Sequence, residues 1–204
     1  MTEYLARVAT VTAALDSFIR DLADLHARCR DDRPGLIEAV RLRLAQLLED
    51  RDVLPAAARL GSPDRYTQHV LHVAPDRSHS IVALVWYPGQ QTAIHDHVSW
   101  CVVGVYEGEE SQTLYHLADD GGEVCLVETG REVARRGSCT ALIPPAENIH
   151  RVANAGSGQA ISIHVYGADI ERLGSSINKT FDDLPIRLIG EHVDAMPRAW
   201  RTVG

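Results

Sequence analysis

Residues 95–108 read HDHVSWCVVGVYEG, a histidine pair followed by a strand-forming run. His95 and His97 flank a single aspartate, and a cysteine and several valines follow. Side chains two residues apart in a strand point to the same face, so the two imidazoles can converge on one ion. Neutral imidazole nitrogen is a common metal ligand. The stretch therefore predicts a metal site in a β-rich protein, completed by a ligand from a neighbouring strand.

His150 is the best third ligand in the sequence. It ends IPPAENIH (residues 143–150), a proline-rich loop that leads into an expected strand. An isolated His-x-His pair is a weak signal, but the two segments together favour a metal site. His26 lies in an expected helix and His192 lies in the tail, and we expect both to be structural or exposed.

Residues 66–166 contain short β-branched or aromatic runs separated by turn residues. The expected strands are residues 67–73, 80–87, 100–107, 111–117, 123–127, 141–143, 150–154 and 160–165. Short strands at this regular spacing are typical of an antiparallel sandwich or a small barrel. We therefore expect a mainly β protein, a cupin jelly-roll barrel with an N-terminal helical segment.

Apolar side chains recur at helical spacing in residues 1 to about 60. One stripe comprises Leu15, Phe18, Leu22 and Leu25, and a second comprises Leu36, Val40, Leu44, Leu47 and Leu48. We interpret both stripes as core packing. A single domain is expected, with helices packed on the barrel in residues 1–62, the barrel in residues 63–170, and a C-terminal extension over the surface in residues 171–204.

Composition narrows the functional classes. The chain has 204 residues and a net charge of −8, which disfavours a nucleic-acid partner because phosphate binding needs clustered Lys and Arg. No apolar run approaches the roughly 20 residues that span a bilayer, and the N-terminus lacks a signal-peptide layout. The 4 cysteines form no CxxC pair. We expect a cytoplasmic protein without a membrane partner, a monomer or small homo-oligomer.

Three segments together resemble the thiol dioxygenases of the cysteine dioxygenase family. They are HDHVSWCVVGVYEG, IPPAENIHRVAN and SIHVYG, the last at residues 162–167, and the resemblance covers residues 64–171. It implies that His95, His97 and His150 hold Fe(2+). Most cupins add a carboxylate ligand four residues after the second histidine, where this chain has Cys101. Three neutral ligands would leave the ion its full 2+ charge and more than one open position, which favours a thiolate and then O2.

Ser162, His164 and Tyr166 alternate along one expected strand and share a face. The resemblance implies that they form a hydrogen-bonded relay whose tyrosine hydroxyl reaches the ligands of the metal. It also admits a thioether crosslink between Cys101 and the ring of Tyr166. The alternatives are a satisfied buried polar network and a small buried apolar cysteine.

The substrate-binding residues depart from the family pattern. Cysteine dioxygenases carry an arginine in a YxR motif, but residues 66–68 read Tyr66-Thr67-Gln68. Gln68 resembles the 3-mercaptopropionate branch, whose arginine follows the HVYG motif, and Arg172 lies in that segment. That branch usually has glycine at the position of Cys101, so the chain combines features of two branches.

The expected partners are therefore a small thiol and O2, and the expected product is a sulfinic acid. Three alternatives stay open at the level of the sequence. They are a cupin dioxygenase for a non-thiol substrate, a non-catalytic metal-binding cupin, and a Ser-His-Asp hydrolase. The chain lacks the GxSxG turn of hydrolases, which disfavours the third.

Overall fold

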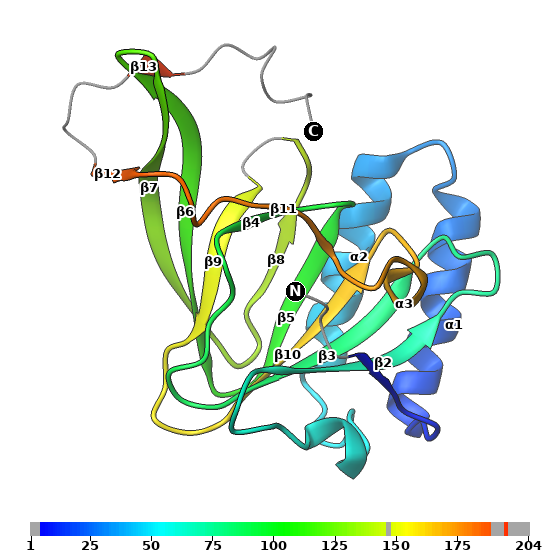
Figure 1. Cartoon of the computed structure of the whole chain (residues 1–204). Helices are drawn as coiled ribbons and strands as arrows, with labels where there is room; N and C mark the ends of the chain where they lie inside the picture. Colours follow the sequence, from blue (N-terminus) through cyan, green and yellow to red (C-terminus); the bar gives the residue numbers. More distant parts are fainter. Residues whose placement is uncertain (1–4, 146–147, 189–193, 196–204) are drawn as a thin grey trace.

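The computed structural model describes residues 5–145, 148–188 and 194–195, and it contains two β-sheets with two helices beside the first sheet (Figure 1). The first sheet has the order β1 (Leu5–Arg7), β2 (Thr67–Val73), β3 (Ser80–Trp86), β10 (Ala160–Tyr166), β5 (Cys101–Glu107) and β8 (Cys139–Leu142). The second has the order β11 (Ile177–Thr180), β4 (His95–His97), β9 (Ile149–Asn154), β6 (Glu109–Asp120), β7 (Glu123–Arg135) and β12 (Ile186–Arg187), and β13 (Asp194–Ala195) pairs with β6. The expectation of a mainly β cupin barrel is confirmed.

The helices lie against the outer face of the first sheet. They are α1 (Ala13–Arg28) and α2 (Arg33–Leu47), and α2 packs on β5 and β8. Thr12 caps α1, because its hydroxyl accepts a hydrogen bond from the Leu15 amide at 3.1 Å. Both apolar stripes are buried in one core with the outward side chains of β3 and β10, as expected for amphipathic helices.

The N-terminal residues depart from the helical expectation. Residues 5–7 form β1, which runs parallel to β2 and pairs Leu5 with Gln68. A strand of three residues carries too little periodicity to be recognised without its partner. A 3-10 turn (η1, Ala56–Arg59) then leads from the helices to the barrel.

The C-terminal residues contribute to the second sheet. The short helix α3 (Ile170–Leu173) is followed by β11, which pairs with β4 so that Ile177 lies opposite His97. The strands β12 and β13 extend the same sheet along β7 and β6. The segment after β10 therefore covers the edge of the metal-binding strand.

Between the sheets, alternate side chains of β3, β5 and β10 point away from the helices. Ile161, Ile163 and Val165 of β10 join the helical core, and their neighbours Ser162, His164 and Tyr166 face the interior of the barrel. Gly108 links β5 to β6 with φ of 73°, and a Cβ there would lie 2.6 Å from the Gln159 carbonyl oxygen.

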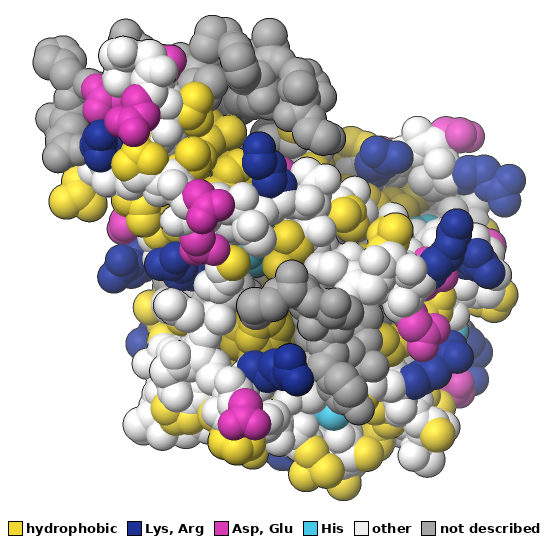
Figure 2. Space-filling view, in the orientation of Figure 1, with side chains coloured by type: hydrophobic (Ala, Val, Ile, Leu, Met, Phe, Trp, Pro, Cys, Tyr) yellow, Lys and Arg dark blue, Asp and Glu magenta, His cyan; other side chains and the backbone are white. Residues whose placement is uncertain are grey.

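The surface is mixed in charge. On the face shown in Figure 2, basic and acidic side chains are interspersed, and the ion pairs include Arg59–Glu107 and Arg135–Glu109. Among the described residues, no helix combines the length and the apolar character that crossing a bilayer requires.

Candidate metal centre

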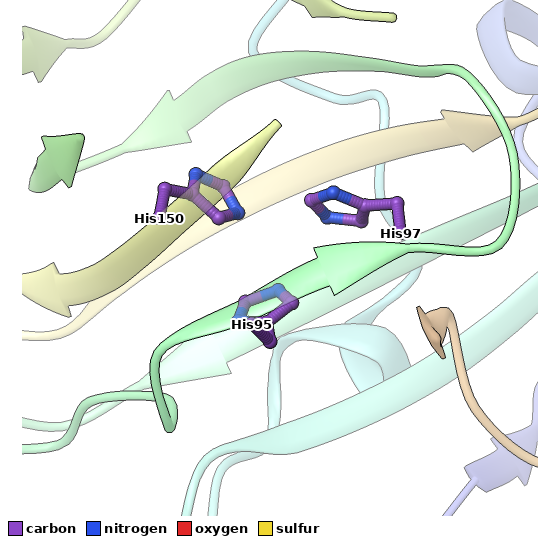
Figure 3. A group of neighbouring side chains, drawn as sticks. All are labelled: His95, His97 and His150. Carbon is purple, nitrogen blue, oxygen red and sulfur yellow. The ribbon is translucent and has the colours of Figure 1, made fainter. Parts of the chain in front are cut away.

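Three buried histidines meet inside the barrel. His95 and His97 lie on β4 and His150 lies on β9, directly opposite His95 in the register of the two strands. The ring centroids are 4.8–4.9 Å apart in all three pairs, and the ligand nitrogens lie within 4.8 Å of one another. Figure 3 shows the three rings arranged around one common space. The structure thus brings together the three ligands predicted from the sequence.

Each of the three rings is oriented by an oxygen at its Nδ1 atom. Nδ1 of His95 lies 3.0 Å from the Ala93 carbonyl oxygen, and Nδ1 of His97 lies 2.8 Å from Oδ1 of Asn148. Nδ1 of His150 lies 3.2 Å from Oε1 of Gln112. An acceptor at Nδ1 places the ring proton there, so the lone pair of Nε2 is left for a metal.

The residues present fit a bound metal ion. Nε2 of His150 is buried and has no hydrogen-bond partner among the described residues, which costs free energy unless a ligand satisfies it. Burial lowers the pKa of His95, and burial with the neighbouring imidazoles holds the pKa of His150 well below its usual range. Both rings are therefore neutral at pH 7, the form in which imidazole binds metals.

The fourth position of the site is not acidic. Among the described residues, the group that could hold an ion contains only the three histidines. Cys101 is fully buried, and burial raises the pKa of its thiol well above the usual value. The side chain is therefore a neutral thiol in the metal-free protein.

The relay residues are in hydrogen-bond contact. The Tyr166 hydroxyl lies 3.1 Å from Nδ1 of His164, and Nε2 of His164 lies 2.9 Å from the Ser162 hydroxyl. Burial lowers the pKa of His164 to about 3, with His97 and His95 as further causes, so this ring is neutral. The ring of Tyr166 lies 6.5 Å from that of His97, which places the tyrosine beside the metal centre.

Cys101 and Tyr166 are direct neighbours across β5 and β10. The side chains of Cys101 and Tyr166 are hydrogen-bonded, and this bond lowers the pKa of the thiol against the larger effect of burial. The Sγ atom of Cys101 also lies 3.7 Å from Nδ1 of His164. This juxtaposition is what a thioether between the two residues requires. The crosslink itself stays a prediction.

A cavity of about 210 Å³ adjoins the histidines. Its walls include Tyr66, Gln68, Trp86, Glu110 and Tyr166. Gln68 is 2% exposed, and its Oε1 atom has no hydrogen-bond partner among the described residues. Two of the three residues predicted to bind the substrate therefore lie at the cavity.

Arg172 lies elsewhere. It is exposed on α3, and the lining of the cavity does not include it. The buried residue of that helix is Ile170, so α3 packs through its isoleucine while Arg172 faces solvent. The described residues of the lining include neither Arg nor Lys.

The other two histidines singled out in the sequence are not at the site. His26 is half-buried on α1 and stacks on His79 with ring centroids 4.3 Å apart, in agreement with a structural interpretation. His192 lies outside the described residues.

Sequence reasoning missed the residues that support the ligands. Asn148 stands two residues before His150 in the proline-rich loop, and no local pattern marks it as a partner of His97. Gln112 reaches His150 because β6 and β9 pair side by side, a register that no local pattern reveals. Glu110 is 4% exposed in the cavity wall, and a buried acid leaves no signature in the alternation of a strand.

A β-barrel that gathers three buried histidines, without a carboxylate in the cluster, defines a cupin metal site of the three-histidine type. A family model described as cysteine dioxygenase type I matches residues 55–174. This match covers more than half of the sequence, and the chain belongs to the cysteine dioxygenase type I family. The fold, the site and the family together identify a cupin thiol dioxygenase, an oxidoreductase of the dioxygenase type.

Solved structures with a similar chain path include other cupins. A cupin superfamily protein from Desulfitobacterium hafniense is 15% identical, with 57% of this chain and 91% of that chain covered and a TM-score of 0.41. A cupin 2 conserved barrel domain protein from Salinispora arenicola is 19% identical, with 56% and 87% covered and a TM-score of 0.39. Oxalate oxidase in complex with glycolate is 17% identical, with 59% and 61% covered and a TM-score of 0.42.

Proposed function

We propose that the protein is an Fe(II)-dependent thiol dioxygenase for a small thiol carboxylic acid, cysteine or 3-mercaptopropionate. The reaction adds both atoms of O2 to the thiol sulfur and gives the sulfinic acid, so that thiol and O2 are the only reactants. The observation that carries the proposal is the cluster of three buried histidines beside the ring of Tyr166, in a chain of this family.

The three imidazole ligands are compatible with iron, but they do not by themselves distinguish iron from zinc or copper. Iron is proposed because the chain belongs to a family named for an O2-dependent reaction. Bound by His95, His97 and His150, the ion would supply the chemistry that joins O2 to sulfur. The chain would hold it through three Nε2 atoms whose rings are fixed by oxygens at Nδ1.

The protein residues around the metal supply orientation and hydrogen bonds. The hydroxyl of Tyr166 is held by His164, which in turn is held by Ser162. A hydroxyl fixed in this way costs little reorganisation when the reacting group arrives. The apolar side chains of Leu84, Val103 and Val105 also line the cavity.

The carboxylate of the substrate would be bound by neutral donors, because the described lining of the cavity contains neither Arg nor Lys. Gln68 lines the cavity, where the Nε2 end of its amide could donate to a carboxylate, and Tyr66 lies in the same wall, stacked on Trp86 with ring centroids 4.5 Å apart. A neutral donor discriminates less strongly than an arginine fork. This supports a tolerance for several thiol acids, so cysteine and 3-mercaptopropionate are both proposed.

Product identification tests the proposal. Protein loaded with Fe(II) is supplied with labelled O2 and, in separate reactions, with cysteine, 3-mercaptopropionate, a thiol without a carboxylate, and a diketone. We expect a sulfinic acid two oxygen atoms heavier than the thiol, with both atoms from O2. Consumption of the diketone alone would support a non-thiol cupin dioxygenase, and metal binding without any O2 uptake would support a non-catalytic cupin.

The ligand assignment has its own control. His97→Ala should lose bound iron together with turnover, because two histidines cannot hold the ion as three do. His116→Ala removes a half-buried histidine outside the cluster and should retain both. Full iron content in His97→Ala would overturn the assignment. A cytoplasmic location is part of the proposal, and cell fractionation checks it.

A further inference from the structure

Glu110 is a buried carboxyl group that the relay of Ser162, His164 and Tyr166 does not account for. It lies on β6, is 4% exposed and forms part of the cavity wall. Its Oε1 atom has no hydrogen-bond partner among the described residues. Burial raises the pKa of Glu110 to about 7, against hydrogen bonding with Ser162 and Trp86, which lowers it. A carboxyl group in this setting exists in both protonation states near neutral pH.

The surroundings of Glu110 leave Ser162 as its link to the metal centre. Its partners on the adjacent strands are Asn154 of β9 and Ala134 of β7, neither of which titrates. Ser162 and Trp86, both on strands of the first sheet, are its hydrogen-bond partners, and no charged group contributes to the shift of its pKa. Glu110 also lies outside the group of side chains that could hold an ion, so it is not a fourth metal ligand.

The titratable groups beyond Ser162 are the next to consider. His164 is neutral, with its pKa lowered to about 3. Cys101 lies 3.7 Å from Nδ1 of His164, and burial raises the pKa of this thiol well above its usual value. Neither group changes charge near pH 7. Glu110 is therefore the member of this connected set that titrates there.

The hydroxyl group of Ser162 couples Glu110 to His164, because its single hydrogen can be donated to only one of them. The hydroxyl has one hydrogen, and its neighbours are Nε2 of His164 at 2.9 Å, the Trp86 indole at 3.4 Å and Glu110. The indole N–H only donates, so it cannot take this hydrogen. Ser162 must donate either to Glu110 or to His164.

Each choice fixes the remaining bonds. An ionised Glu110 only accepts, so Ser162 donates to it and accepts from Nε2–H of His164. Nδ1 of His164 then carries a lone pair and accepts from the Tyr166 hydroxyl. A protonated Glu110 donates to Ser162, which donates to Nε2. Nδ1 then carries the proton and donates to the Tyr166 oxygen, and the tyrosine hydrogen is released toward the cavity.

We propose that Glu110 is a positioning residue whose carboxyl group sets the direction of the hydrogen bonds through Ser162 and His164, and thereby decides whether the Tyr166 hydroxyl donates into the cavity or to His164. The two states differ by one proton, which Glu110 takes from solvent. Ser162, His164 and Tyr166 keep the same number of protons in both, and the single ring proton of His164 changes from Nε2 to Nδ1.

One consequence rests on the proposed function. A substrate carboxylate in the same 210 Å³ cavity raises the pKa of Glu110 further, because like charges disfavour ionisation. Substrate binding would then favour the protonated state, in which Tyr166 donates toward the metal centre. The hydroxyl would be ready as a donor when the thiol acid is bound.

The test reads the tautomer of His164 in the metal-free protein, so it does not depend on turnover. Nitrogen NMR of protein labelled in its histidines is recorded from about pH 5 to about pH 9, on both sides of the Glu110 titration, and the signals are assigned with His164→Gln. We expect the ring proton to move from Nδ1 at low pH to Nε2 at high pH. A tautomer that is the same at every pH in the wild-type protein would overturn the proposal.

Variants identify the group responsible. Glu110→Gln should abolish the pH-dependent change, and so should Ser162→Ala, which leaves Glu110 in place but breaks its link to His164. Glu109→Gln is the matched control, because this neighbouring side chain is half-exposed and pairs with Arg135 at 2.9 Å. It should keep the change. A change that persists in Glu110→Gln or Ser162→Ala would overturn the proposal, whereas failure to form a sulfinic acid would overturn only the proposed function.

Discussion

At the scale of single residues, the metal centre depends on atoms that do not touch the metal. The rings of His95, His97 and His150 each meet an oxygen at Nδ1, from a backbone carbonyl, an asparagine and a glutamine respectively. These contacts select the tautomer and the orientation of each ring. Because the oxygens come from separate elements, each ligand can be weakened on its own.

Asn148→Ala should lower metal affinity by about 10–100-fold, because His97 loses the acceptor that orients it. Asn148→Asp supplies an oxygen again and should recover most of the affinity. Competition with a chelator measures the change. Asn178→Ala is the control, since that side chain is exposed and bonds only to Asp96 in the described structure. Equal affinities for Asn148→Ala and wild type would show that the tautomer of His97 is fixed by other contacts.

A second prediction for single residues concerns Cys101 and Tyr166. Adjacent and buried, they should form a thioether during exposure to iron, thiol and O2. Mass spectrometry of the intact chain should then show a species lighter by two hydrogen atoms, and Cys101→Ser should lack it. Retention of the lighter species in Cys101→Ser would place the modification at another residue.

At the scale of elements, the helices and the site share strands. β5 and β10 present one face to α1 and α2 and the other to the cavity, so the helical packing holds the relay in place. Gly104 of β5 lies close against the side chains at the C-terminal end of α2. A Cβ at that position would lie 2.6 Å from Cδ1 of Leu48 and 3.1 Å from Cδ2 of Leu44.

Gly104→Val should therefore destabilise the protein by about 1–3 kcal/mol, the usual cost of overpacking a filled core. Urea unfolding of the metal-free chain measures it. Gly130→Val is the control, because no atom lies within 4 Å of a Cβ added there. If both variants unfold at the same urea concentration, α2 can move away from β5 at little cost.

At the scale of the whole molecule, buried imidazoles govern the response to pH. The pKa is lowered at six described histidines, chiefly by burial: His26, His72, His79, His95, His150 and His164. Below the unfolded value of about 6.5, the unfolded chain binds protons that the folded chain does not. Stability is thus lost as pH falls. The pKa of Glu110 is raised, so between about pH 4.5 and about pH 7 this group makes the folded protein more stable as pH falls. Its contribution offsets the loss of stability caused by one of the histidines.

The free energy of unfolding of the metal-free protein should accordingly decrease from pH 7 to pH 5, by up to about 1.4 kcal/mol per pH unit for each histidine that stays neutral. Urea titrations at a series of pH values measure this. A bound divalent metal should raise stability at pH 7 and steepen the loss on acidification, because protons then compete with the metal for the ligands. Stability that rises on acidification of the metal-free protein would contradict the burial of these rings.

Most strands were predictable because their alternation is local. The expected strand at residues 67–73 coincides with β2, and those at 80–87 and 160–165 differ from β3 and β10 by one residue. The strands β1, β11 and β12 were not predicted. They have two to four residues each, and they exist because an edge of a sheet offers unpaired backbone groups.

The sequence by itself determined the barrel, the helical stripes and the three histidines of the metal centre, because each follows from the spacing of residues along the chain or from a short motif. Only the tertiary structure decided which oxygens orient the histidines, that Arg172 lies away from the cavity, and that Glu110 meets Ser162. Apart from the local contact between Ala93 and His95, those contacts join segments that are distant in sequence, and the pairing of the strands sets their partners. No local pattern of residues records that pairing.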